Sequence, residues 1–70
     1  MKHKHIIIIG RASEAENEIA NYRNTTEKDA VSKFKKHIMD VYEFKDGERD
    51  IYLEAVIASD SHQKVLQYQQ

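Results

Sequence analysis

The amino-terminal histidines are the residues of this sequence whose types and spacing best suit metal binding. His3 is third from the amino terminus, where the terminal amine, two backbone amides and the imidazole can form a square-planar site for Cu(II) or Ni(II). His5 would lie on the same face of a strand as His3. A zinc site needs three or four ligands, however, and neither a cysteine nor an obvious acidic partner stands beside the pair. We therefore expect His3 and His5 to form a solvated strand start, with metal binding as the alternative, and we expect no cofactor.

The spacing of the other candidate residues does not support catalysis. Asp60, Ser61 and His62 are the residue types of a hydrolytic triad, but neighbours in sequence point in different directions and cannot adopt that geometry. Gly10 follows a strand-like run, yet one glycine provides no nest of backbone amides for a phosphate. Alternating acidic residues at 14–18 and 46–50 would lie in solvent, where nothing activates them for acid–base chemistry. We expect the protein not to be an enzyme.

Opposite charges are concentrated in different parts of the chain. Residues 1–11 carry three basic residues and no acidic one, and residues 33–37 carry three lysines. Residues 40–60 carry seven acidic residues against two basic ones, a local sum of −5. This asymmetry fits a protein partner with a complementary patch and fits self-association equally well, with an ordinary solvated surface as the alternative. The candidate binding residues come from these segments: Lys33, Lys36, His37, Asp46, Glu48 and Asp50.

The composition is that of one small domain, residues 1–70, with little core. The chain has 70 residues, a net charge of −1 and no cysteine, so no disulfide can compensate for a domain that buries only about 60% of its surface. We therefore expect self-association, as a homodimer, or a protein partner. The longest aliphatic run, residues 6–9, is too short for a membrane span, and we expect a cytoplasmic protein without membrane contact. The near-zero net charge argues against a nucleic-acid partner.

The first part of the chain predicts two strands. Residues 3–9 are apolar on both faces once the isoleucines begin, as in a central strand, and Gly10 would break the run at a turn or bulge. Residues 11–24 leave two interpretations open. A short helix has a capping pair, Ser13 with Glu16, but its apolar stripe is mostly alanine. In the other interpretation, which we prefer, residues 18–24 pair back onto the isoleucine strand.

Residues 26–39 show the clearest helix pattern of the sequence. Thr26 followed by Asp29 is typical of a capped helix start. Lys33, Lys36 and His37 would point to solvent. Apolar residues recur at intervals of three and four and would turn one stripe toward a sheet: Ala30, Val31, Phe34, Ile38 and Val41.

The rest of the chain predicts a hairpin and a terminal helix. Residues 41–44 and 49–58 would be the two strands, with Asp46 and Gly47 in the turn between them; in an alternative, Val41 and Tyr42 extend the preceding helix. Residues 59–70 would form a short helix. In the second strand, one face would belong to the core, with Ile51, Leu53, Ala55 and Ile57, and the other would carry Tyr52, Glu54 and Val56.

Together these elements predict an α+β fold. We expect a small, mostly antiparallel sheet of three to four strands with one main helix packed on one face. The expected order is ββαββ, followed by the short C-terminal helix.

This order of elements resembles the compact ββαβ-type proteins common among small bacteriophage and mobile-element products, which include inhibitors of host RNA polymerase and several anti-CRISPR proteins. The resemblance is architectural and covers most of the chain. It depends on three segments: Ile6 to Ile9, Thr26-Glu27-Lys28-Asp29-Ala30-Val31, and the Asp46-Gly47 turn. Such proteins usually bind a target through a sheet edge, a helix face or a charged loop, and the resemblance implies the same here.

The function expected from the sequence is therefore non-enzymatic. We expect a small interaction protein, of phage or prophage origin, that binds and modulates a host protein. One alternative is a nucleic-acid accessory module that uses Arg11, the amino-terminal lysines and the basic helix. The other is a small subunit or fragment of a larger complex.

Overall fold

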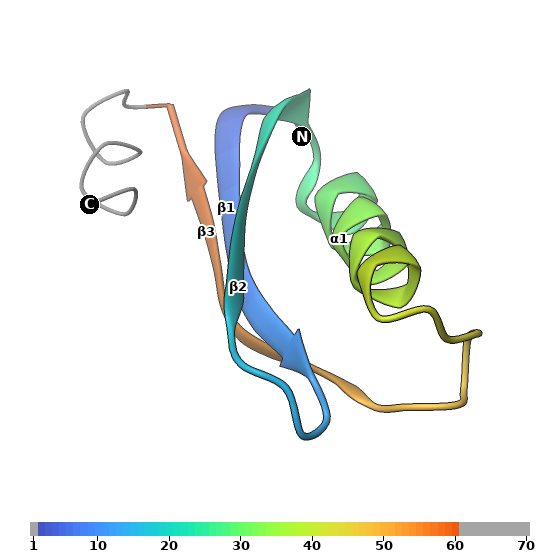
Figure 1. The fold of residues 1–70 in the computed structure, drawn as a ribbon. Helices are drawn as coiled ribbons and strands as arrows, with labels where there is room; N and C mark the ends of the chain where they lie inside the picture. Colours follow the sequence, from blue (N-terminus) through green and yellow to red (C-terminus); the bar gives the residue numbers. More distant parts are fainter. Residues whose placement is uncertain (1, 61–70) are drawn as a thin grey trace.

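The computed structural model describes residues 2–60, which form a three-stranded antiparallel sheet with one helix on one face (Figure 1). The elements are β1 (His3–Ala12), β2 (Glu18–Thr25), α1 (Glu27–Val41) and β3 (Ile51–Ser59), and the strand order is β2-β1-β3. The predicted α+β class is confirmed, with the order ββαβ. The predicted C-terminal helix covers residues 59–70. Ser59 instead ends β3 and Asp60 follows it, and residues 61–70 lie outside the described residues.

β1 is the central strand, as its isoleucines predict. Ile6, Ile7 and Ile8 are all buried, β2 and β3 pair with the two edges of β1, and Ile6 and Ile8 pack in the core beneath α1. The expectation that Gly10 breaks the run is wrong in one respect, since β1 continues to Ala12. It is right in another, because the pairing with β3 shifts register between Ile9 and Gly10.

Of the two interpretations of residues 11–24, the strand is correct: β2 begins at Glu18, and no helix forms in this segment. β2 pairs antiparallel with β1, with Ile9 opposite Ile19 and His3 opposite Thr25. Glu14 adopts a φ of 63° in the connecting turn. The strand prevails because β1 has an open edge that β2 can hydrogen-bond, whereas the apolar stripe of a helix here would be mostly alanine.

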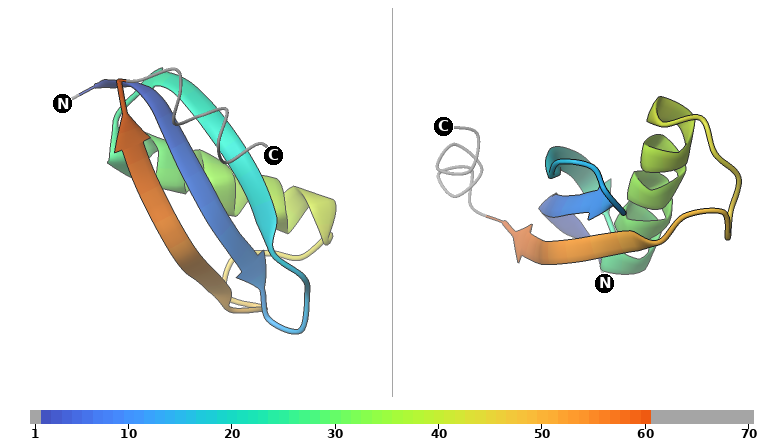
Figure 2. Two further views of the ribbon diagram at one scale, coloured as in Figure 1. Left: turned by 90° about the vertical axis from the view of Figure 1, so that its left-hand side faces the viewer. Right: turned by 60° about the horizontal axis from the view of Figure 1, so that its bottom comes forward.

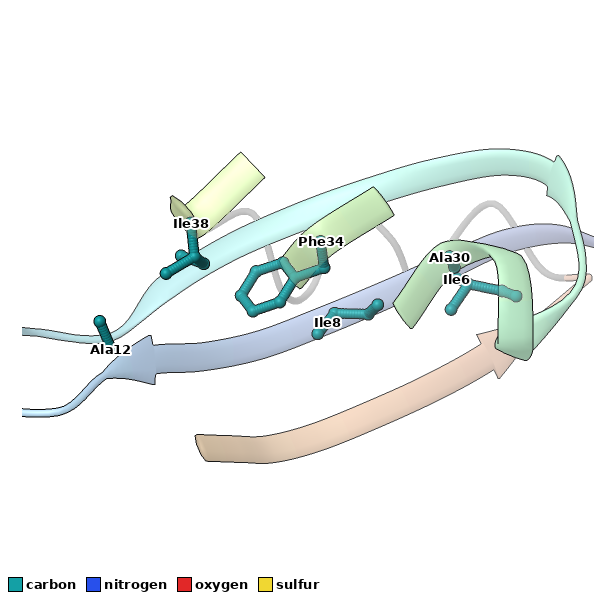
Figure 3. Close-up of a cluster of buried hydrophobic side chains, with 6 residues drawn as sticks. All are labelled: Ile6, Ile8, Ala12, Ala30, Phe34 and Ile38. Carbon is teal, nitrogen blue, oxygen red and sulfur yellow. The ribbon is translucent and has the colours of Figure 1, made fainter. Parts of the chain in front are cut away.

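α1 begins where its capping residues predict. The backbone N–H of Asp29 donates to the Thr26 side-chain oxygen at 3.1 Å. Phe34 and Ile38 lie over β1 on the same side as Ile6 and Ile8 (Figure 3). The helix runs to Val41 and Tyr42 is its C-cap, so the alternative in which Val41 and Tyr42 extend the helix is confirmed for Val41. The Val41 side chain is 49% exposed and does not continue the buried stripe.

The predicted hairpin of residues 41–58 does not form. Residues 42–50 are a connection without a strand, and β3 pairs with β1, so the described residues contain three strands and no fourth. Gly47 has the expected positive φ, 87°, but its turn leads from α1 to β3. The reason is that α1 brings the chain back across the sheet to the free edge of β1. Along that edge β3 finds more backbone hydrogen-bond partners than the predicted four-residue strand 41–44 could provide.

The predicted core face of β3 is correct only in its first half. Ile51 lies opposite Ala12 and Leu53 opposite Gly10, on the helix side, but Glu54 has no partner in β1. This one-residue bulge reverses the alternation. Ala55 and Ile57 therefore lie on the face away from α1, and Val56, predicted for that face, packs against the core with Ala58.

Candidate protein-interaction surface

The charged residues chosen from the sequence are exposed but do not form one site. Lys33, Lys36 and His37 lie on the outer side of α1, and the three acidic residues lie in the loop between α1 and β3: Asp46, Glu48 and Asp50. Within residues 2–60, an ion pair joins Arg11 to Glu54, His37 Nε2 lies 3.9 Å from the Glu18 carboxylate, and no ion pair joins the helix lysines to the acidic loop.

Two of the acidic side chains have local partners in the loop. The Glu48 carboxylate accepts the backbone N–H of Lys45 at 2.9 Å, and Asp50 accepts the Tyr52 hydroxyl at 3.4 Å. The backbone carbonyl of Asp50 also accepts the N–H of Ser13 at 2.8 Å. These contacts give the acidic loop a structural role whatever else it binds.

The amino-terminal histidines occupy different environments. His3 is half-buried, whereas His5, which lies opposite Arg23 of β2 and Ser59 of β3, is only 8% exposed. The expected solvated strand start is therefore wrong for His5. Over residues 2–60, no three histidines or carboxylates gather as a metal-binding group, and the same residues enclose no pocket.

A cluster that the sequence analysis missed joins the loop to the first hairpin. The Arg49 guanidinium donates to the backbone carbonyl of Ser13 and lies 5.5 Å from the ring centre of Tyr42 and 5.3 Å from that of Phe44. Burial raises the pKa of Tyr42, and the carboxylate of Glu18 raises it further, while Arg49 opposes the increase. The contacts of Arg49 stabilise the connection between α1 and β3.

The sheet face opposite α1, which we call the open face, is turned to the viewer on the left of Figure 2, with α1 behind it. Strand pairing places alternate residues on it: His5, Ile7, Ile9 and Arg11 of β1, Ile19, Asn21 and Arg23 of β2, and Tyr52, Ala55, Ile57 and Ser59 of β3. The face is therefore largely apolar along its centre.

The end of the open face near the β1–β2 turn is exposed, and we call it the distal patch: Ile9, Arg11, Ile19, Tyr52 and Glu54. Ile19 is 57% exposed beside Ile9, and Tyr52 is 45% exposed beside Arg11. The Arg11 guanidinium lies 4.9 Å from the ring centre of Tyr52, and its Nε is 3.8 Å from the Glu54 carboxylate.

Sequence reasoning missed this patch for an identifiable reason. The sequence places Tyr52 and Glu54 on the face of β3 away from the core, but their neighbours across the strands depend on register, which the local pattern does not contain. Arg11 enters the sequence prediction only as one charge of the basic segment 1–11 and as a residue of the nucleic-acid alternative. One usable signal is that Ile19 shares a face of β2 with Asn21 and Arg23, because an isoleucine on an otherwise polar face of an edge strand indicates a face that is not fully solvated.

Among residues 2–60, no helix is long and apolar enough to cross a membrane. No protein-family model, curated protein or solved structure matches this chain.

Proposed function

We propose that the protein acts by binding another protein through the distal patch, without catalysis. The main evidence is the exposure of Ile19: more than half of its surface is accessible to solvent, beside a second isoleucine, Ile9. Burying that surface against a partner would be favourable at about 25 cal/mol per Å² of apolar area, before the costs of association.

The residues around Ile19 are those that protein interfaces favour. Tyrosine and arginine are enriched among the residues that contribute most to binding, and here Arg11 lies over the ring of Tyr52. The carboxylate of Glu54 also restrains Arg11. Because the guanidinium is already held, it loses little conformational entropy when a partner binds.

The proposal includes the partner expected from the sequence, a host protein whose activity is modulated. Its support is the ββαβ order, which is also the order of the small phage proteins the chain resembles, and the exposure of Ile19 and Tyr52 on the open face. The exposed residues of α1 and of the acidic loop remain predicted as a second contact region, and homodimerisation remains a prediction for sedimentation analysis.

The test compares two substitutions of the same kind on different surfaces. Ile19→Asp places a charge in the distal patch, and Val41→Asp places one at the end of α1, where the side chain is about as exposed. Tagged full-length proteins would be used to capture partners from a bacterial lysate. The affinity for the protein recovered in fixed ratio would then be measured by calorimetry.

We expect Ile19→Asp to weaken binding by roughly thirtyfold, the effect of about 2 kcal/mol at a central interface residue, and Val41→Asp to leave it unchanged. Equal affinity of the two variants would contradict the proposal. A nucleic-acid function would instead appear as binding to a random oligonucleotide that weakens steeply with salt and depends on Lys33 and Lys36.

A further inference from the structure

β2 is an edge strand, so one side of its backbone has no strand partner among residues 2–60. The strand order β2-β1-β3 leaves the outer edges of β2 and β3 at the two sides of the sheet (Figure 2). The unpaired N–H and C=O groups of such an edge are a template on which another strand can pair. The outer edge of β2 is therefore a candidate surface for strand pairing.

The hydrogen bond of Lys4 identifies which backbone groups of β2 point inward. The Lys4 N–H donates at 3.0 Å to the carboxylate of Asp60, which directly follows β3, so this part of the Lys4 backbone points away from β2. Successive residues of a strand direct their backbone groups to alternate edges. The groups of Ile7, three residues further on, therefore point toward β2, where Ile7 lies opposite Asn21. The backbone groups of Asn21 are thus the ones that pair with β1.

The backbone groups of Ala20 and Tyr22, on either side of Asn21, consequently point to the outer edge. They lie in a regular stretch, because residues 18–23 pair with β1 without a shift of register. The stretch ends at Asn24, whose φ is 52°. The outer edge of β2 thus presents two outward-pointing residues on an evenly paired backbone.

β2 lacks the features that usually protect an exposed edge. Natural edge strands carry lysine or proline, or are interrupted by a β-bulge. The sequence of β2, EIANYRNT, contains neither lysine nor proline. β3, in contrast, has its bulge at Glu54. Of the two outer edges, that of β2 is the better suited to pairing with another strand.

The charges of β2 indicate which strand is complementary to it. Glu18 lies at one end of the regular stretch and the exposed Arg23 at the other. When two β2 strands pair antiparallel, the acidic end of each copy lies beside the basic end of the other, whereas parallel pairing would bring like charges together. A second copy of this chain therefore matches the edge in charge.

Side-chain size selects an alignment centred on Asn21. In this alignment Ala20 lies opposite Tyr22 of the second copy, and these outward-pointing residues exchange hydrogen bonds. Both side chains are partly buried against the core on the helix side, so the ring from one copy would extend the core over the small residue of the other. A shift by two residues would place Ala20 opposite its own equivalent or opposite Asn24, whose backbone is not extended.

We propose that two copies of this chain pair through the outer edges of β2, antiparallel and about a two-fold axis at Asn21, so that the two sheets become continuous. The axis is perpendicular to the sheet, and both helices therefore lie on the same face. Each helix is about 10 Å across and lies on three strands spaced about 4.8 Å apart, which leaves room for both. This inference goes beyond the proposed function and does not depend on it, because the purified chain alone tests it.

Single cysteines test the alignment, because the chain contains no cysteine of its own. In Asn21→Cys the two cysteines face each other across the axis, with Cα atoms about 4.5–5.5 Å apart, which suits a disulfide. Arg23→Cys is the control on the same face of the same strand. Its two Cα atoms would be about 14 Å apart in the proposed dimer, beyond the reach of a disulfide.

We expect mild oxidation of the full-length protein to link Asn21→Cys into dimers at least tenfold faster than Arg23→Cys. Residue 23 is the more exposed position, so linkage by random collision would favour the control. Equal rates, or faster linkage of Arg23→Cys, would overturn the proposal.

Sedimentation equilibrium gives a second measurement. The unsubstituted full-length chain should sediment with twice the mass of one copy. Ala20→Pro removes an outward N–H without breaking a bond to β1, so the variant should fold, as circular dichroism would show, and should dimerise at least tenfold more weakly. A chain that stays monomeric at millimolar concentration, or a folded Ala20→Pro variant with unchanged dimer affinity, would overturn the proposal.

Discussion

Replacing Gly10 with alanine is expected to destabilise the protein through a collision between strands. A Cβ atom at this position would lie 2.6 Å from the backbone oxygen of Tyr52 and 2.9 Å from the Phe34 ring. The contact with Tyr52 is the more costly, because a backbone oxygen inside the β1–β3 pairing cannot turn away as a side chain can. Gly10 does not have a positive φ, so the effect would come from space and not from backbone strain.

The magnitude follows from two opposing contributions. Overpacking a close-packed site costs typically about 1–3 kcal/mol, and replacing glycine by alanine returns about 0.4–1 kcal/mol by restricting the unfolded chain. We expect a net loss of roughly 1–2 kcal/mol. In a domain of this size, that corresponds to a fall in Tm of roughly 4–16 °C.

A double-mutant cycle in thermal or urea unfolding tests the mechanism. Phe34→Leu removes the ring from the position that the new Cβ would approach, so Gly10→Ala should cost less in that background, with a coupling of about 0.5 kcal/mol or more. Gly47→Ala is the control, because its cost comes from the φ of 87° with no atom within 4 Å, and it should be additive with Phe34→Leu. A neutral Gly10→Ala, or additivity of both pairs, would refute the reasoning.

Three further predictions concern the ends of α1 and the loop after it. Thr26→Ala should lose about 1 kcal/mol of stability in thermal unfolding by circular dichroism, because Asp29 loses its acceptor, while Thr26→Ser should retain most of it. Arg49→Lys should speed proteolysis of the loop from residue 42 to residue 50, because an ammonium cannot reproduce the planar contacts of the guanidinium; unchanged cleavage would contradict the role given to Arg49. NMR titration should give a pKa for Tyr42 above 10.0, closer to that value in Glu18→Gln. Since the raised pKa means that the folded state holds this proton more tightly, the linked stability is complete below about pH 10 and is lost as the pH rises through the folded pKa.

The candidate surface was less predictable than the fold. The distal patch joins residues from three strands, and Arg11 meets Tyr52 only because β3 pairs with β1 after a bulge at Glu54. With unbroken alternation, Ala55 and Ile57 would have faced α1, and Val56 would have taken their place on the open face. The alternating sequence pattern of a strand has a period of two, and it does not indicate where a β-bulge leaves one residue unpaired.

The amino-acid sequence by itself determined the elements whose cause is local. Consecutive isoleucines require burial on two faces and so place β1 at the centre of the sheet, and Thr26 with the apolar stripe through Phe34 determines where α1 begins and which side it buries. Only the tertiary structure decided which edge of β1 receives β3, which side chains of β3 reach the core, and which part of the open face stays exposed. These three features depend on contacts between residues more than forty positions apart, such as Gly10 with Tyr52. The free energy of such a contact cannot be predicted from the local sequence pattern.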